Sequence, residues 1–104
     1  MSRIKYNKPV VCADGFEMSV QANSRNYSEL DLRTRKYTSV EVGFPSHFEP
    51  LLQPWADDPE DPTNTVYGYV PVERVALVCA KHGGVVSGEL PPGVVRLEVI
   101  EGGS

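Results

Sequence analysis

The sequence predicts an α+β domain in which a mostly antiparallel, twisted sheet of four to six strands carries one main helix on one face. Short segments that alternate apolar and polar residues are separated by turn residues, which is typical of half-buried strands. A single stretch near residues 71–82 instead repeats its apolar residues at three- and four-residue steps, which is typical of a helix. The length of 104 residues fits one domain, with residues 101–104 as a flexible tail.

The main helix is expected at about Pro71–His82. Pro71 suits the first helical position, because the N–H that it lacks would have no partner there. A run of valines falls on one face of the helix. His82 suits the negative end of the helix dipole, and Gly83 can adopt the left-handed conformation that ends a helix. The helix would have about three turns, so it depends on packing against the sheet.

Strands are expected on both sides of this helix in the sequence. Asp14 and Gly15 favour a tight turn between the first two, and the third should pair with the second. Tyr67 and Tyr69 would share one face of a regular strand, either as core side chains or as an aromatic platform. The expected strands lie at residues 10–12, 16–22, 38–44, 66–70, 85–86 and 94–100.

The segment between the third strand and the helix is rich in proline. Ser46 and Glu49 have the spacing of a capping box, which predicts one helical turn. Leu51 and Leu52 are expected to fold back with Trp55 as an apolar flap over the edge of the sheet. Trp55 is then either a core residue or an exposed anchor for a partner.

Composition excludes several classes of function. A formal charge of −4 and an isoelectric point near 5.1 disfavour binding to nucleic-acid backbones. No apolar run approaches the ~20 residues that span a bilayer, and no signal peptide is recognised, so we expect a cytoplasmic protein. Cys12 and Cys79 are expected as buried thiols or, alternatively, as a disulfide. The spacing of cysteines and histidines predicts no zinc site, and no cofactor is expected.

Charge is distributed unevenly along the chain. Residues 1–36 carry seven basic and four acidic residues, a net charge of +3. Residues 37–104 carry three basic and ten acidic residues, a net charge of −7. Two polar segments hold most of the concentrated charge, and each is a candidate binding surface.

The first segment is basic and aromatic. Guanidinium groups and aromatic rings are the groups that proteins use to hold phosphate and to stack on a base. The segment could therefore bind an anion or nucleotide, or it could be a solvated loop whose charges pair with nearby acids. Arg33 and Arg35 would share a face if this piece is extended. The candidate ligand-binding residues are Arg25, Tyr27, Arg33, Arg35, Lys36 and Tyr37.

The second segment is acidic and contains two prolines. It could bind a basic partner or a divalent cation, or it could be a solubilising connector. It lacks the alternating ligands and the glycine of an EF-hand loop. The candidate partner-binding residues are Trp55, Asp57, Asp58, Glu60 and Asp61.

Catalytic signatures are absent from the sequence. The chain has no G-x-S-x-G, P-loop, G-x-G-x-x-G or H-E-x-x-H motif. His47 fits a capping turn and His82 fits a helix end, so neither is assigned to catalysis. Gly83 and Gly84 follow a helix, whereas a phosphate-binding glycine loop precedes one. We therefore expect a protein that is not an enzyme and has no catalytic residues.

Four blocks of the chain resemble a group of small, largely uncharacterised proteins encoded by tailed bacteriophages. The blocks are KPVVCADGFEMSVQA, VEVGFPS, DPTNTVYGYVPVE and KHGGVVSGELPPG, within residues 8–22, 40–46 and 61–93. The resemblance implies an accessory protein of the bacterial host cytoplasm. Such proteins commonly bind and inhibit a host factor, including components of antiviral defence, and some sequester nucleotide signals. The candidate ligand segment at residues 23–36 lies outside the four blocks.

The leading hypothesis is a non-enzymatic protein that inhibits a host factor, using the acidic segment and neighbouring aromatic residues. The alternative is a sponge that uses the basic segment to sequester a phosphorylated nucleotide signal, cyclic nucleotides included. A small enzyme or a virion component is a further alternative. Expected edge strands at both ends of the chain leave homo-oligomers open.

Overall fold

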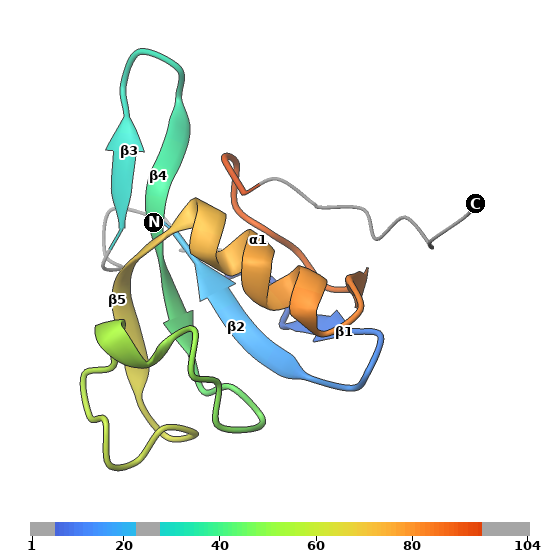
Figure 1. Cartoon of the computed structure of the whole chain (residues 1–104). Helices are drawn as coiled ribbons and strands as arrows, with labels where there is room; N and C mark the ends of the chain where they lie inside the picture. Colours follow the sequence, from blue (N-terminus) through green and yellow to red (C-terminus); the bar gives the residue numbers. More distant parts are fainter. Residues whose placement is uncertain (1–5, 23–27, 95–104) are drawn as a thin grey trace.

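The structure is a computed structural model that describes residues 6–22 and 28–94. It contains six strands, one α-helix and one 3-10 helix in the order β1, β2, β3, β4, η1, β5, α1, β6 (Figure 1). Their bounds are β1 Val10–Cys12, β2 Glu17–Gln21, β3 Glu29–Asp31, β4 Lys36–Gly43, η1 Gln53–Trp55, β5 Val66–Pro71, α1 Val72–Lys81 and β6 Val85–Ser87. The predicted α+β class is confirmed.

All pairings of the sheet are antiparallel. The strand order is β3-β4-β2-β1-β6, and β5 also pairs with β4. The predicted pairing of the second and third strands is confirmed, with Val20 opposite Val42. The β3–β4 hairpin extends beyond the rest of the sheet, and α1 lies across the sheet (Figure 1). Leu30 and Leu32, at this hairpin, are exposed.

Helix α1 has nearly the predicted bounds. Pro71 precedes the helix as its N-cap rather than occupying the first helical position. The apolar face is confirmed, because Val75 and Val78 are fully buried. Gly83 ends the helix with φ +90°, a conformation that residues with a Cβ rarely adopt. Its backbone also lies against the β1–β2 turn, where an added Cβ would be 2.9 Å from the Cβ of Ala13.

The core lies between α1 and the sheet. The two cysteines meet there as buried thiols that are not joined in a disulfide. Burial raises the pKa of Cys12, and a hydrogen bond with Cys79 offsets part of this rise. The fully buried members include Val10, Met18, Val20, Val40, Val42, Leu52, Tyr67 and Val70.

One sequence prediction is wrong in the segment that follows β4, and another is confirmed in part. Residues 46–47 form a bend and residues 48–49 have no regular structure, so the predicted helical turn with its capping box is not formed. Ser46 instead accepts a hydrogen bond from the backbone N–H of Glu17 through its Oγ, at 2.9 Å. The predicted flap is present in part, with Leu52 fully buried and Trp55 at the end of η1. The predicted strand at 94–100, beyond Val94, and the tail at 101–104 lie outside the described residues.

Candidate functional site

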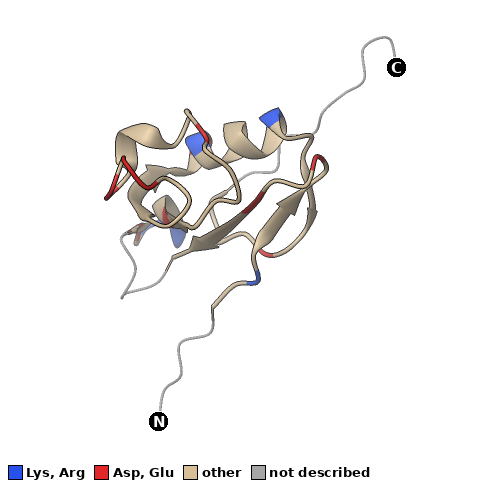
Figure 2. Cartoon of the chain, turned by 90° about the horizontal axis from the view of Figure 1, so that it is seen from below, with Lys and Arg blue, Asp and Glu red and all other residues tan. Residues whose placement is uncertain are grey.

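The acidic segment forms an ordered loop between η1 and β5, which we call the acidic loop (residues 57–64). Ala56 pairs with Tyr67 in an isolated bridge, and the N–H of Asp57 donates to the carbonyl of Val66 at 2.9 Å. The start of the loop is therefore held beside β5 by backbone contacts. Figure 2 shows the acidic segments of the chain in red, including those of this loop.

Side chains of the loop itself fix its shape. Asp58 accepts a hydrogen bond from the N–H of Glu60 at 3.1 Å, and Asp61 accepts one from the side-chain amide of Asn64 at 3.1 Å. The buried hydroxyl of Tyr67 donates to the carbonyl of Pro62, which holds the middle of the loop against β5. A loop that is already ordered loses less entropy when it binds a partner.

The acidic loop adjoins a hollow of about 310 Å³. The hollow is lined by Trp55, Ala56, Asp57, Val66, Gly68 and Tyr69. Trp55 is half-buried, so it both packs against the core and borders the hollow. On its ring lies the guanidinium of Arg74 from α1, at 5.3 Å from the centroid, which is a cation–π distance.

Tyr69 reaches the hollow because β5 contains a bulge. Val40 pairs with Val70 and Val42 pairs with Tyr67, so two residues of β5 stand opposite a single residue of β4. Tyr69 has φ +54°, which is an outlier for an aromatic residue. The bulge breaks the alternation that the sequence predicts, because Tyr67 is fully buried while 49% of Tyr69 is exposed. The predicted common face of the two tyrosines is therefore wrong.

The four candidate acids and Trp55 thus lie in one region, as the sequence led us to expect. All four acids are exposed. Within the described part of the chain, no hydrogen bond or ion pair is found for the carboxylates of Asp57 and Glu60. The sequence did not indicate Tyr69 or Gly68 as members of this region, although a glycine inside a strand is a known signal of a bulge.

The candidate ligand-binding residues are more dispersed. Arg25 and Tyr27 lie outside the described residues. Arg33, Arg35 and Lys36 are exposed at the tip of the β3–β4 hairpin, in a turn that Asp31 stabilises by accepting the N–H of Arg33 at 2.8 Å. Arg35 has φ +58°, so the segment is a tight turn and not the extended piece that would place both arginines on one face.

Tyr37 differs from these cations, because its side chain packs against the core. It is half-buried and packs against the core, whereas its neighbour Lys36 is exposed. Its N–H donates to the carbonyl of Pro92 at 2.9 Å, which joins β4 to the segment after β6.

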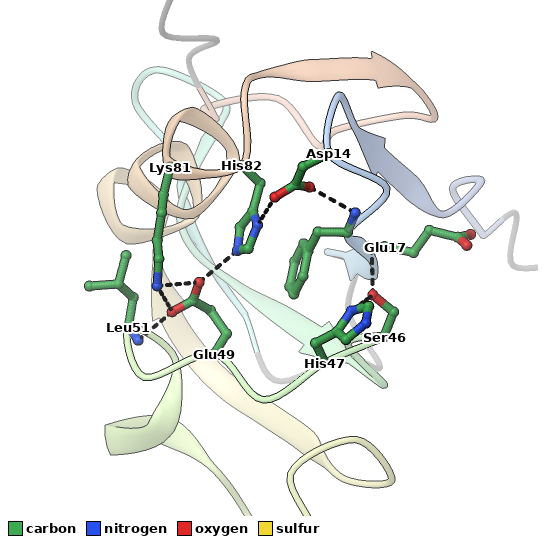
Figure 3. A network of polar contacts seen from close by, with 9 residues as sticks. Asp14, Glu17, Ser46, His47, Glu49, Leu51, Lys81 and His82 are labelled. Carbon is green, nitrogen blue, oxygen red and sulfur yellow. Dashed lines mark hydrogen bonds and ion pairs between the residues drawn. The ribbon is translucent and has the colours of Figure 1, made fainter.

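A polar network that the sequence did not reveal lies at the other end of α1 (Figure 3). Nδ1 of His82 is 2.6 Å from Oδ2 of Asp14, and Nε2 is 2.7 Å from Oε1 of Glu49. Lys81 Nζ contacts the carboxylate of Glu49 at 3.0 Å. The His82 ring stacks on Phe16, with centroids 4.1 Å apart. His82 thus does more than meet the helix dipole.

Both carboxylates of the network are stabilised in their charged form. Burial alone would raise the pKa of Glu49, but the N–H of Leu51 together with Lys81 and His82 outweighs it and lowers the pKa. The N–H of Phe16, followed by His82, lowers the pKa of Asp14. Both ring nitrogens of His82 are engaged by these two carboxylates. The network holds three segments together.

A second histidine borders the same region. Asp14, Phe16, His47 and His82 line a hollow of about 250 Å³. His47 is exposed, and its Nδ1 is 2.9 Å from the Oγ of Ser46. That Oγ already accepts the N–H of Glu17, and among residues 6–22 and 28–94 no third side chain forms a hydrogen bond with His47. Within the described residues, the pair therefore lacks the third group that would orient His47 as a base for a serine nucleophile.

Two structural findings limit other classes of site. Among the described residues, no three His, Cys, Asp or Glu side chains gather as metal ligands would. Over residues 6–22 and 28–94, no helix has the length and apolar character that a membrane crossing requires.

Comparisons with known proteins identify no relative. No family model matches the chain, and neither a curated protein nor a solved structure matches it.

Proposed function

We propose that this chain is a non-enzymatic binding protein that occupies a basic surface of a partner protein. The observation that carries the proposal is the combination of an ordered, exposed acidic loop with an adjoining hollow bordered by Trp55 and Tyr69. Aromatic residues dominate the energy of many interfaces, and complementary charge speeds and orients association.

The order of the loop supports this reading over that of a passive connector. A connector that only solubilises the protein does not need side-chain caps at Asp58 and Asp61 or a hydrogen bond to the buried Tyr67. These bonds fix the carboxylates of Asp58 and Asp61, and the backbone that carries the other two acids, before any partner arrives. The resemblance of the sequence blocks to phage accessory proteins extends the proposal to a host factor in the bacterial cytoplasm. A component of antiviral defence, inhibited by being occupied, is the partner we propose.

The experiment compares wild type with a variant in which Asp58→Asn, Glu60→Gln and Asp61→Asn are combined. Asparagine keeps the side-chain oxygen that caps the loop, so the variant removes charge with little change of shape. The matched control combines Glu17→Gln, Glu29→Gln and Glu89→Gln, which removes three charges from exposed positions elsewhere.

Each protein is used to capture partners from a bacterial lysate, and the captured protein is purified and titrated by calorimetry. We expect the loop variant to bind about tenfold more weakly, at roughly 0.5 kcal/mol for each of three charges. Higher salt should weaken wild type more than the variant. Equal affinity of the loop variant, the control and wild type would rule the acidic loop out as the contact.

A second candidate function is a nucleotide sponge, favoured by the three cations at the tip of the β3–β4 hairpin. Arg33, Arg35 and Lys36 are exposed on one short turn, where they could surround a phosphate. A thermal-shift panel of mono- and cyclic nucleotides tests this function. A rise in melting temperature that is lost in an Arg33→Gln/Arg35→Gln variant supports it, and no shift across the panel counts against it.

A further inference from the structure

We infer that the hollow bordered by Trp55 and Tyr69 receives one arginine side chain of the partner, with Asp57 as the counter-charge. The inference rests on the proposed function and adds the residue type that is recognised.

The lining of the hollow suits a guanidinium group. Trp55 and Tyr69 supply aromatic rings, and Asp57 supplies an exposed carboxylate on the same hollow. A guanidinium is planar, stacks on aromatic faces and offers two parallel N–H donors to a carboxylate. A lysine ammonium is a compact, strongly hydrated charge that can use the carboxylate but gains less from the rings.

The size of the hollow is sufficient for a long side chain. Its volume of about 310 Å³ is near the lower end of the range for small-molecule pockets, which begins at roughly 300 Å³. One arginine side chain can therefore enter it from an extended peptide on the surface.

The chain itself shows that Trp55 accepts a guanidinium. Arg74 lies 5.3 Å from the centroid of the Trp55 ring, and Arg74 is not among the residues that line the hollow. The internal contact therefore leaves the hollow itself to another group. Trp55 and Asp57 both line the hollow, so the carboxylate of Asp57 is available to a cation that enters it.

The bulge in β5 provides an independent indication. Tyr69 is held at φ +54°. The bulge leaves its ring exposed, whereas regular pairing would place it on the same face as Tyr67. Strained residues of this kind persist where the surrounding structure enforces them, and they concentrate at binding and catalytic sites. Of the three described non-glycine residues with positive φ, Tyr69 is the one that borders this hollow.

Trp55 is the single tryptophan of the chain, so its fluorescence reports directly on the hollow. The probe is a short peptide of alternating glycine and arginine. Two matched peptides carry lysine, or the neutral arginine analogue citrulline, in place of each arginine. The variants are Asp57→Asn and Tyr69→Gly, with Glu17→Gln as the single-charge control.

Tyr69→Gly is chosen because glycine adopts positive φ readily, so the variant removes the ring and relieves the strain. Asp57→Asn keeps the backbone N–H that donates to Val66. Circular dichroism and the melting temperature establish that each variant is folded. If Tyr69→Gly fails to fold, Asp57→Asn decides the question.

We expect saturable binding of the arginine peptide, about tenfold tighter than the lysine peptide, and no saturable change with citrulline. Asp57→Asn and Tyr69→Gly should each weaken arginine binding by about tenfold, and Glu17→Gln should change it by less than about twofold. Equal affinity for arginine and lysine, or wild-type affinity in both hollow variants, would overturn the inference.

The outcome for the hollow can be separated from that for the proposed function. If the combined Asp58, Glu60 and Asp61 variant loses binding to the captured partner while Asp57→Asn and Tyr69→Gly retain it, the acidic loop is the contact and the arginine pocket is refuted. If no variant affects partner binding, both proposals fail.

Discussion

Glu49→Ala is the substitution that tests the polar network most directly. The carboxylate of Glu49 is 1% exposed and accepts from three donors. These are the N–H of Leu51 at 2.8 Å, Nε2 of His82 at 2.7 Å and Nζ of Lys81 at 3.0 Å. The substitution removes all three bonds together and leaves the donors in place.

The three losses differ in cost. The Lys81 side chain is 47% exposed and recovers water, so its contact is worth at most about 1 kcal/mol. His82 is 17% exposed, and a buried donor without a partner costs about 1–3 kcal/mol. The N–H of Leu51 adds a smaller cost of the same kind. Relief of the burial penalty of the carboxylate offsets part of the sum, because removing charge from the interior is favourable. We expect a loss of about 2–4 kcal/mol in the free energy of unfolding.

The assay is urea denaturation at pH 7, followed by Trp55 fluorescence and circular dichroism. Glu49→Gln is the matched variant, because it keeps an oxygen for Leu51 while removing the charge, and we expect about half the loss. Lys81→Ala is the control and should cost less than about 1 kcal/mol. If Glu49→Ala costs no more than Lys81→Ala, the network does not stabilise the fold as we argue.

Three further predictions concern pH, the helix end and the loop. The pKa of Glu49 is lower in the folded state than in the unfolded state. The carboxylate therefore stabilises the fold above the unfolded pKa of about 4.3, and this stabilisation is lost as pH falls through the folded pKa. Urea midpoints measured from pH 7 to pH 3 should fall for wild type and fall less for Glu49→Gln. Gly83→Ala should destabilise the fold more than Gly84→Ala, because both glycines have φ +90° but only a Cβ at Gly83 would meet a neighbour. Calorimetry should show a loss of about 1–2 kcal/mol in the free energy of unfolding for Gly84→Ala and about 1 kcal/mol more for Gly83→Ala. Tyr67→Phe removes the donor to the carbonyl of Pro62, and it should cost about 1–2 kcal/mol and speed hydrogen exchange in the acidic loop; unchanged exchange would contradict the role of this bond.

Local signals in the sequence were enough to predict the helix and most strands. Gly83 marks the end of the helix because a residue without a side chain readily adopts the positive φ found there. The turn at Asp14 and Gly15 is likewise set by adjacent residues, and the alternation in β2 matches its buried Met18 and Val20. Such features depend on residues close in the sequence.

The features that the sequence did not reveal depend on distant residues or on a change of period. Glu49 reads as part of a local capping box, but its partner His82 is 33 positions away. The bulge at Tyr69 depends on how β5 meets β4, since period-2 alternation alone places both tyrosines on one face. The acidic residues were identified correctly as exposed, because runs of charge and proline are solvated in most contexts.

The network at the end of α1 also has a consequence for kinetics. Its contacts join Asp14, Glu49 and His82 across separations of 68 and 33 residues. Contacts between such distant residues require long loops to close, so they are expected to form after the folding transition state. Interactions that are absent from the transition state affect mainly the unfolding rate. Loss of Glu49 should therefore shorten the lifetime of the folded molecule while leaving the speed at which it folds almost unchanged.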